Sequence, residues 1–125
     1  MITYAERSCF RQAHLRLLSR VEAYVARISS AWGNELRCHE LARAVHLIVQ
    51  DHKLELVDGK CGPVEHSWLV LSDGAILDPY VPGRLPAIQL VDPIVGRMYQ
   101  PGEPREDIRD TIIDRLIMEM RGTAI

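Results

Sequence analysis

The sequence predicts an α+β fold in which helices pack on a small antiparallel β-sheet of three or four strands. Apolar residues recur with helical periodicity in three segments, Tyr4 to about Ser29, Leu36–Gln50 and Glu106–Arg121. Between the second and third segments, short runs of strand-forming residues alternate with Gly- and Pro-containing turns. The chain has 125 residues, the length of one domain with one core, so we expect a single domain over residues 1–125.

Composition argues against several classes of protein. Charged residues make up 26% of the chain and hydrophobic residues 47%, which is typical of a soluble globular domain. The formal net charge is -2, so no overall positive field would recruit nucleic acid or an anionic membrane surface. No apolar run approaches the ~20 residues that span a bilayer, and charged residues interrupt the N-terminal segment where a secretory signal would lie. We therefore expect neither a nucleic-acid nor a membrane partner.

The three cysteines are Cys9, Cys38 and Cys61. An odd number of cysteines in a chain long enough to fold without disulfides favours a reducing compartment, so we expect free thiols and a cytoplasmic location. Cys9 lies beside Phe10 on the apolar stripe of the first predicted helix, and we interpret it as a small buried hydrophobe.

The apolar period breaks at Ser29, Ser30, Gly33 and Asn34, so we expect the first helix to end in this region. Asn34 is then predicted to cap the second helix, Leu36–Gln50, with Glu35 in its first turn. Cys38 follows in or just after that turn, where unpaired amides and the helix dipole favour a thiolate. The same position on the apolar stripe also suits an inert core cysteine.

The central segment predicts a hairpin whose loop length decides which side chains meet. Lys53–Val57 is a short strand candidate, and the Asp58-Gly59 and Gly62-Pro63 pairs indicate a turn region. Val64–Leu71 is predicted to be a strand, joined through Ser72-Asp73-Gly74 to a return strand that ends at Asp78.

A three-residue loop with Gly74 in the left-handed region places Trp68 opposite Asp78. His66 and Asp78 then form a diagonal pair on one sheet face, roughly 7–8 Å apart at the backbone. A two-residue loop would instead send Asp78 to the other face.

With the three-residue loop, a thiol, an imidazole and a carboxylate can converge. Asp78 would orient His66, and His66 would take the proton of Cys38 and later protonate the leaving group. The alternative interpretations are a half-buried structural histidine for His66 and a turn residue before Pro79 for Asp78. We predict Cys38, His66 and Asp78 as catalytic residues, in a Cys-His-Asp core of about residues 34–80.

The C-terminal third carries fewer signals. Val81–Arg84 is predicted to be a turn, Ala87–Val91 a further strand and Pro93–Pro104 a loop before the closing helix. Candidates for lining a substrate groove are Tyr80, Arg84 and Tyr99.

A zinc site is the main chemical alternative. Cys38, His39, Cys61 and His66 supply suitable ligand atoms. However, Cys38 and His39 are adjacent on a helix and project about 100° apart, and no paired Cys-x-x-Cys supports the site. We therefore predict no metal and no cofactor.

These residues carry a resemblance to a known family. A helix bearing Cys38 with Ala42 one turn later, then His66-Ser67-Trp68, then Asp78-Pro79, resembles the transglutaminase-like branch of the papain-like cysteine hydrolases. The resemblance covers well under half of the chain, and Arg37 stands where the family often has a small residue. It implies a papain/transglutaminase-like core, with Cys38 as nucleophile, His66 as general base and acid, and Asp78 as the orienting carboxylate.

Acyl transfer also requires an oxyanion hole, to which the amide of Cys38 can contribute. Asn34 and Trp32 lie shortly before Cys38 and are candidates for oxyanion or substrate positioning, although a helix cap is the better interpretation of Asn34. Trp68 is a further candidate, although core packing is the better interpretation of this residue.

The function we expect is a cysteine-dependent acyl-transfer enzyme acting on an amide or ester bond of a peptide, a protein or a small amide. Its intermediate would be a Cys38 thioester, which covers peptidase, amidase, deamidase and transglutaminase chemistry. The alternative is a non-catalytic protein-binding domain of the same fold.

Overall fold

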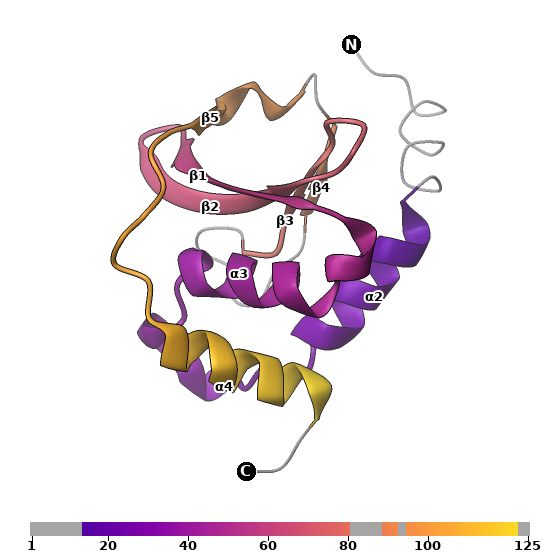
Figure 1. Ribbon diagram of the computed structural model, residues 1–125, viewed down its shortest axis with the longest axis vertical. Coiled ribbons are helices and arrows are strands. Elements are labelled where there is room, and N and C mark those ends of the chain that lie inside the picture. Colours follow the sequence, from indigo (N-terminus) through magenta and orange to yellow (C-terminus); the bar gives the residue numbers. More distant parts are fainter. Residues whose placement is uncertain (1–13, 81–88, 93–94, 123–125) are drawn as a thin grey trace.

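The computed structural model describes residues 14–80, 89–92 and 95–122 and has the α+β class that the sequence predicts. Within these residues, the α-helices are α2 (Leu15–Val25), α3 (Cys38–Ile48) and α4 (Asp110–Arg121). The strands are β1 (Glu55–Cys61), β2 (Val64–Val70), β3 (Ile76–Asp78), β4 (Gln89–Val91) and β5 (Tyr99–Pro101). Short 3₁₀ helices are η1 (Ser30–Glu35), η2 (Gln50–His52) and η3 (Val95–Met98). The strands form one curled antiparallel sheet in the order β4-β3-β2-β1-β5 (Figure 1).

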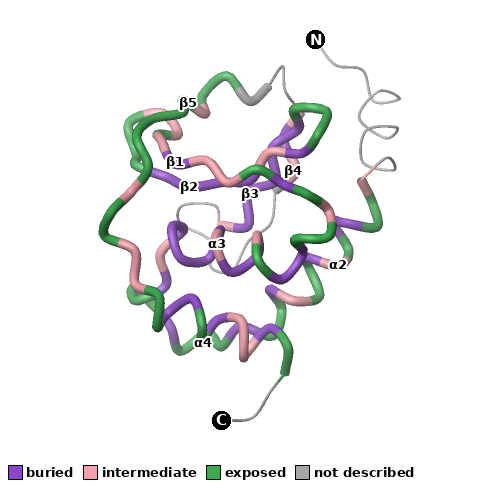
Figure 2. The backbone as a smooth tube through the Cα atoms, in the orientation of Figure 1, coloured by how far each residue is buried: buried purple, intermediate pink, exposed green. Residues whose placement is uncertain are grey.

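Helix α3 lies between the sheet and α4, and α2 lies beside it (Figure 1). Most of α3 is therefore buried, as Figure 2 shows. The core between these layers consists of the apolar stripes of the helices and one face of the sheet, including Leu41, Val45, Leu69, Leu77 and Leu116. A smaller cluster of Trp68, Ile76 and Val91 covers the opposite face.

The helices begin and end at different residues from those predicted. Helix α2 ends at Val25, before the predicted end at Ser29, and residues 1–13, which include Cys9, lie outside the described part. The prediction that Asn34 caps the second helix is wrong, because Asn34 lies in η1 and α3 begins only at Cys38. Gly33 has a φ of +51°, a conformation that glycine adopts without strain, and turns the chain between the two helices. The residue at the N-cap of α3 is Arg37, in an extended conformation.

The prediction of a turn at Asp58-Gly59 is also wrong, because β1 continues through both residues to Cys61. The reason lies in β5, in the region predicted to be a loop, which pairs with β1 opposite Gly59. A Cβ atom on Gly59 would overlap the carbonyl oxygen of Gln100. The glycine thus permits a close backbone approach rather than a turn, and the sheet has five described strands instead of three or four.

The predicted register of the central hairpin is confirmed. Leu69 pairs with Leu77, Val70 pairs with Ile76, and the amide of Leu71 donates to the carbonyl of Ala75 at 2.8 Å. The loop therefore has three residues, and Gly74 has a φ of +89°. This register places the side chains of positions 66, 68 and 78 on the same face of the sheet.

Helix α4 begins at Asp110 rather than at Glu106 and buries a stripe of Ile112, Ile113, Leu116 and Met120 against the core. Gly122 follows it with a φ of +71°, the usual left-handed end of a helix. In the part of the chain that the structure describes, every helix is too short or too polar to cross a bilayer.

Candidate active site

Cys38 is the first residue of α3, and its side chain is buried. The first amides of an α-helix have no partner within the helix and carry the positive end of its dipole, so they stabilise negative charge nearby. The only acidic residue of this first turn, Glu40, is held by bonds from Arg37 and Arg109. Its charge is therefore compensated, and it leaves the positive potential at Cys38 largely intact.

The carboxylate of Asp78 is hydrogen-bonded on both oxygens. Nε2 of His66 lies 2.7 Å from its Oδ2, and both side chains are only 1% exposed. The hydroxyl of Tyr99 donates to the same oxygen at 2.7 Å, and the amide of Tyr80 donates to Oδ1 at 3.1 Å. A carboxylate bound in this way accepts a hydrogen bond from the Nε2–H group of His66. Nδ1 of a neutral His66 therefore carries the free lone pair.

Two aromatic rings surround the imidazole of His66. Trp68 stacks with it at a centroid distance of 6.2 Å and an interplanar angle of 25°, and Tyr99 lies at 6.1 Å. Nδ1 of His66 is buried and has no hydrogen-bond partner among the described residues. An orphaned, buried ring nitrogen is unusual, and it is an available proton acceptor.

The Cys38 thiol and the His66 imidazole each change the pKa of the other. Burial opposes ionisation of Cys38, but interactions with His39 and His66 outweigh it and lower the thiol pKa to about 6. Burial likewise opposes protonation of His66, but Asp78 and Cys38 outweigh it and raise the imidazole pKa to about 9. Between these two values, the favoured state is a thiolate beside an imidazolium.

Cys38 and His66 both line one cavity of about 310 Å³. His66 reaches the cavity because β2 extends beyond β3, whose pairing with β2 stops near Asp78. Pro79 follows and has no amide hydrogen with which to continue the ladder. The remaining residues that line the cavity are Asn34, Leu36, Arg37, His39, Val64, Glu65 and Tyr80.

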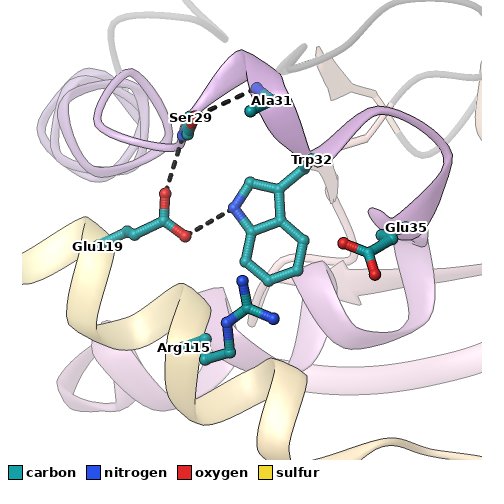
Figure 3. A pocket seen from close by; sticks show the side chains of 6 residues that line it. All are labelled: Ser29, Ala31, Trp32, Glu35, Arg115 and Glu119. Atoms are coloured by element: carbon teal, nitrogen blue, oxygen red, sulfur yellow. Dashed lines mark hydrogen bonds between the residues drawn. The ribbon is translucent and has the colours of Figure 1, made fainter. Parts of the chain in front are cut away.

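The residues predicted to position substrate separate in the structure. Asn34 is exposed and lines the cavity of Cys38, although it is not a helix cap. Trp32 lines a different cavity, where its indole nitrogen donates to Glu119 at 2.6 Å and Arg115 lies over its ring (Figure 3). Trp68 is 1% exposed and packs in the smaller apolar cluster, beside His66.

Of the groove candidates, Tyr80 lines the cavity and Arg84 lies outside the described residues. Tyr99 has a more specific place than the sequence suggested, because its hydroxyl donates a hydrogen bond to the carboxylate of Asp78. Only the alignment of β5 with β1 brings Tyr99 there, and its position in a Gly- and Pro-containing segment gave no local signal of it.

Within the described part of the chain, His, Cys, Asp and Glu side chains form no group of three or more that could hold a metal ion. Cys38 and Cys61 are both free thiols. Burial is the main cause that raises the pKa of the Cys61 thiol, in contrast to that of Cys38. The two cysteines are thus chemically distinct, and Cys38 is the more acidic.

Neither a protein-family model, nor a curated protein, nor a solved structure matches this chain. The candidate site is therefore interpreted from its own residues.

Proposed function

We propose that the protein is a cysteine-dependent acyl-transfer enzyme that acts on an amide or ester bond through a thioester on Cys38. The observation that carries the proposal is the buried His66–Asp78 pair, whose unpartnered ring nitrogen shares a cavity with an acidified thiol. A thiol of this kind is a nucleophile at neutral pH, whereas a core cysteine stays protonated.

In the proposed reaction, the Cys38 thiolate attacks the carbonyl carbon of the substrate, and the carbonyl π electrons move to its oxygen. The amides of the first turn of α3 have no partner within the helix and can donate to that oxyanion. The tetrahedral intermediate then collapses, the bond to the leaving group breaks, and His66 gives its proton to the departing nitrogen or oxygen. A thioester on Cys38 and a neutral His66 remain.

The thioester is resolved by water or by an amine. His66 accepts a proton from the attacking molecule through Nδ1, while Asp78 holds the opposite ring nitrogen. The second tetrahedral intermediate expels the Cys38 thiolate, which restores the thiolate–imidazolium pair. No cofactor takes part in either half of this reaction.

The resemblance of the segment around Cys38, His66 and Asp78 to transglutaminase-like cysteine hydrolases supports the same proposal, including a papain/transglutaminase-like core. The cavity of about 310 Å³ is near the lower limit for ligand pockets, so it would enclose the scissile bond rather than a whole substrate. A peptide, a protein segment or a small amide fits that limit. A free, acidified thiol also agrees with a reducing, cytoplasmic location.

Alkylation of Cys38 tests the ionisation on which the proposal depends. In a Cys9→Ala/Cys61→Ala background, the rate of reaction with iodoacetamide should rise with a midpoint near pH 6. His66→Ala should move that midpoint upward and slow labelling at neutral pH. A midpoint near the ordinary thiol value of about 8.5 in the Cys9→Ala/Cys61→Ala protein would contradict the proposal and favour a non-catalytic binding domain.

Trapping of the acyl-enzyme tests the chemistry itself. Incubation with activated esters and with a library of peptide amides should add an acyl mass to the tryptic peptide that contains Cys38. The adduct should be removed by hydroxylamine, and the Cys38→Ala variant should not form it. A protein whose Cys38 ionises near pH 6 but accepts no acyl group from any member of the panel would not be the proposed enzyme.

A further inference from the structure

The Cys38 thiol has a second imidazole neighbour, His39, which the reaction described above does not use. The sulfur lies 3.6 Å from Nδ1 and 3.8 Å from Nε2 of His39. Because it is almost equidistant from the two nitrogens, it is not in line with either N–H bond. His39 therefore contacts the nucleophile but is not aligned to accept its proton directly. We assign that role to His66.

A buried chain of polar groups holds the ring of His39. Its Nδ1 lies 2.7 Å from the hydroxyl of Ser67, which donates to Oδ1 of Asp58 at 2.5 Å. The other oxygen of Asp58 accepts from Arg43 at 2.6 Å and from the amide of Arg105 at 3.0 Å. His39, Ser67 and Asp58 are all buried. Helix α3, β2, β1 and the segment after β5 each contribute to the chain.

The direction of these hydrogen bonds fixes the proton on His39. Burial opposes ionisation of Asp58, but bonds from Arg43, Ser67 and the Arg105 amide lower its pKa, so it is a carboxylate and accepts the single hydroxyl proton of Ser67. The Ser67 oxygen can then only accept from Nδ1–H of His39. A neutral His39 thus carries its lone pair on Nε2, and a further proton there would be stabilised by the carboxylate at the end of the chain.

Other charged groups also face this region. Arg37 and Glu40 pair with each other at the start of α3, and Asp78 binds His66 from β3. Burial raises the pKa of Tyr80, and the charge of Cys38 raises it further. Further charged groups among the described residues are Glu65 of β2 with its partner Arg105, Asp107, which binds Arg37, and Arg109, which binds Glu40. Among the described residues, His39 contacts the sulfur of Cys38 and His66 lines the same cavity, so these are the two imidazoles beside the nucleophile.

We propose that His39, oriented by Ser67 and Asp58, is a second imidazole that stabilises the Cys38 thiolate. This inference rests on the proposed function and adds a residue to it. When the second tetrahedral intermediate expels the thiolate, His39 lies against the sulfur and stabilises its charge together with the imidazolium of His66. The nucleophile would thus have one imidazole for proton transfer and another for its charge.

The test is the pH profile of Cys38 alkylation in the Cys9→Ala/Cys61→Ala background. Ser67→Ala removes the hydroxyl that links His39 to Asp58 and leaves the side chains of Cys38 and His66 unchanged. It should move the midpoint upward by about one pH unit, so that labelling at pH 5 is about tenfold slower. Above pH 9, where the thiol is ionised in both proteins, the rates should be equal. Ser67→Thr, which keeps a hydroxyl, should restore the profile of the parent protein, and His39→Gln should behave as Ser67→Ala.

Nitrogen-15 NMR of the histidine side chains tests the same inference on the unmutated chain, so it does not depend on the folding of any variant. His39 should be protonated at Nδ1, and its Nε2 signal should respond to alkylation of Cys38. An Nε2-protonated neutral His39 would overturn the inference. So would a folded Ser67→Ala protein whose alkylation midpoint is unchanged, because a merely structural Ser67 would alter stability only.

The two proposals fail in different ways. If the midpoint moves with His66→Ala but not with Ser67→Ala or His39→Gln, the role of His39 is wrong and the proposed function stands. If the unmutated thiol already has its midpoint near pH 8.5, both are wrong.

Discussion

Replacing Asp78 by asparagine is expected to lower the pKa of His66 from about 9 to about its ordinary value of 6.5. Burial lowers this pKa, and the hydrogen bond to Asp78 is the largest of the interactions that raise it. The difference between 9 and 6.5 corresponds to about 3 kcal/mol of preference for the imidazolium over the neutral ring. Asparagine keeps the shape of the side chain and removes its charge, so it isolates this contribution.

The measurement is an NMR titration of the histidine ring protons between pH 5 and 10. The chain has five histidines, and the signal that disappears in His66→Gln identifies the one of interest. In Asp78→Asn, that signal should titrate about 2.5 pH units lower than in the parent protein. The signals of the other histidines should keep their midpoints, which also reports that the variant has folded.

Tyr99→Phe is the matched control. It removes a neutral donor from the same carboxylate oxygen that binds His66 and leaves the charge of Asp78 in place. The pKa of His66 should then stay near 9 or rise slightly, because the carboxylate loses a competing donor. If His66 still titrates near 9 in Asp78→Asn, the carboxylate does not hold the imidazolium, and the assignment of Asp78 as the orienting residue is wrong.

Three further predictions concern stability. Glu40→Gln should lower the free energy of unfolding at pH 7 by about 2 kcal/mol in urea, because it leaves two guanidinium groups without a carboxylate between them. That difference should shrink as the pH falls from 4.5 through about 2, the pKa of Glu40 in the fold; equal stabilities at pH 7 would contradict it. Gly59→Ala should lower the free energy of unfolding by about 2 kcal/mol, because its methyl group overlaps the β5 backbone. Gly102→Ala makes only ordinary contacts and should lower it less, which thermal unfolding of the two variants would measure. The lowered pKa of Cys38 makes stability rise with pH between about 6 and 9, and the raised pKa of His66 makes it fall between 6.5 and about 9. The two slopes of unfolding free energy against pH cancel in the parent protein. Cys38→Ala should therefore lose stability as the pH rises through this window, whereas the parent protein should not. Identical slopes in the two proteins would refute the ion pair.

Local patterns sufficed for the elements whose side chains repeat with a regular period. The apolar stripes predicted α3 and α4, because one face of each helix must be buried whatever it packs against. The hairpin after Leu71 was predicted with its register, because Gly74 fixes the loop length and the loop fixes which residues face each other. The approach of His66 to Asp78 follows from that register alone.

Elements that depend on distant partners were not predicted. Gly59 resembles a turn residue in the sequence, and only the close approach of β5 explains it. Asn34 resembles a helix cap, but the turn at Gly33 delays the helix to Cys38. At Gly59 a distant backbone segment decides the conformation, whereas at Asn34 the positive φ of the preceding glycine does so.

The candidate nucleophile, base and carboxylate could be predicted from local patterns, because each lies at a regular position of a helix or a strand. The hydrogen bonds around these groups could not, because they form only when the layers pack together. Tyr99 reaches Asp78 through a strand pairing, and Ser67 joins His39 to Asp58 across two strands and a helix. Such hydrogen bonds join residues far apart in the chain, and their strength depends on burial, which exists only once the layers have packed.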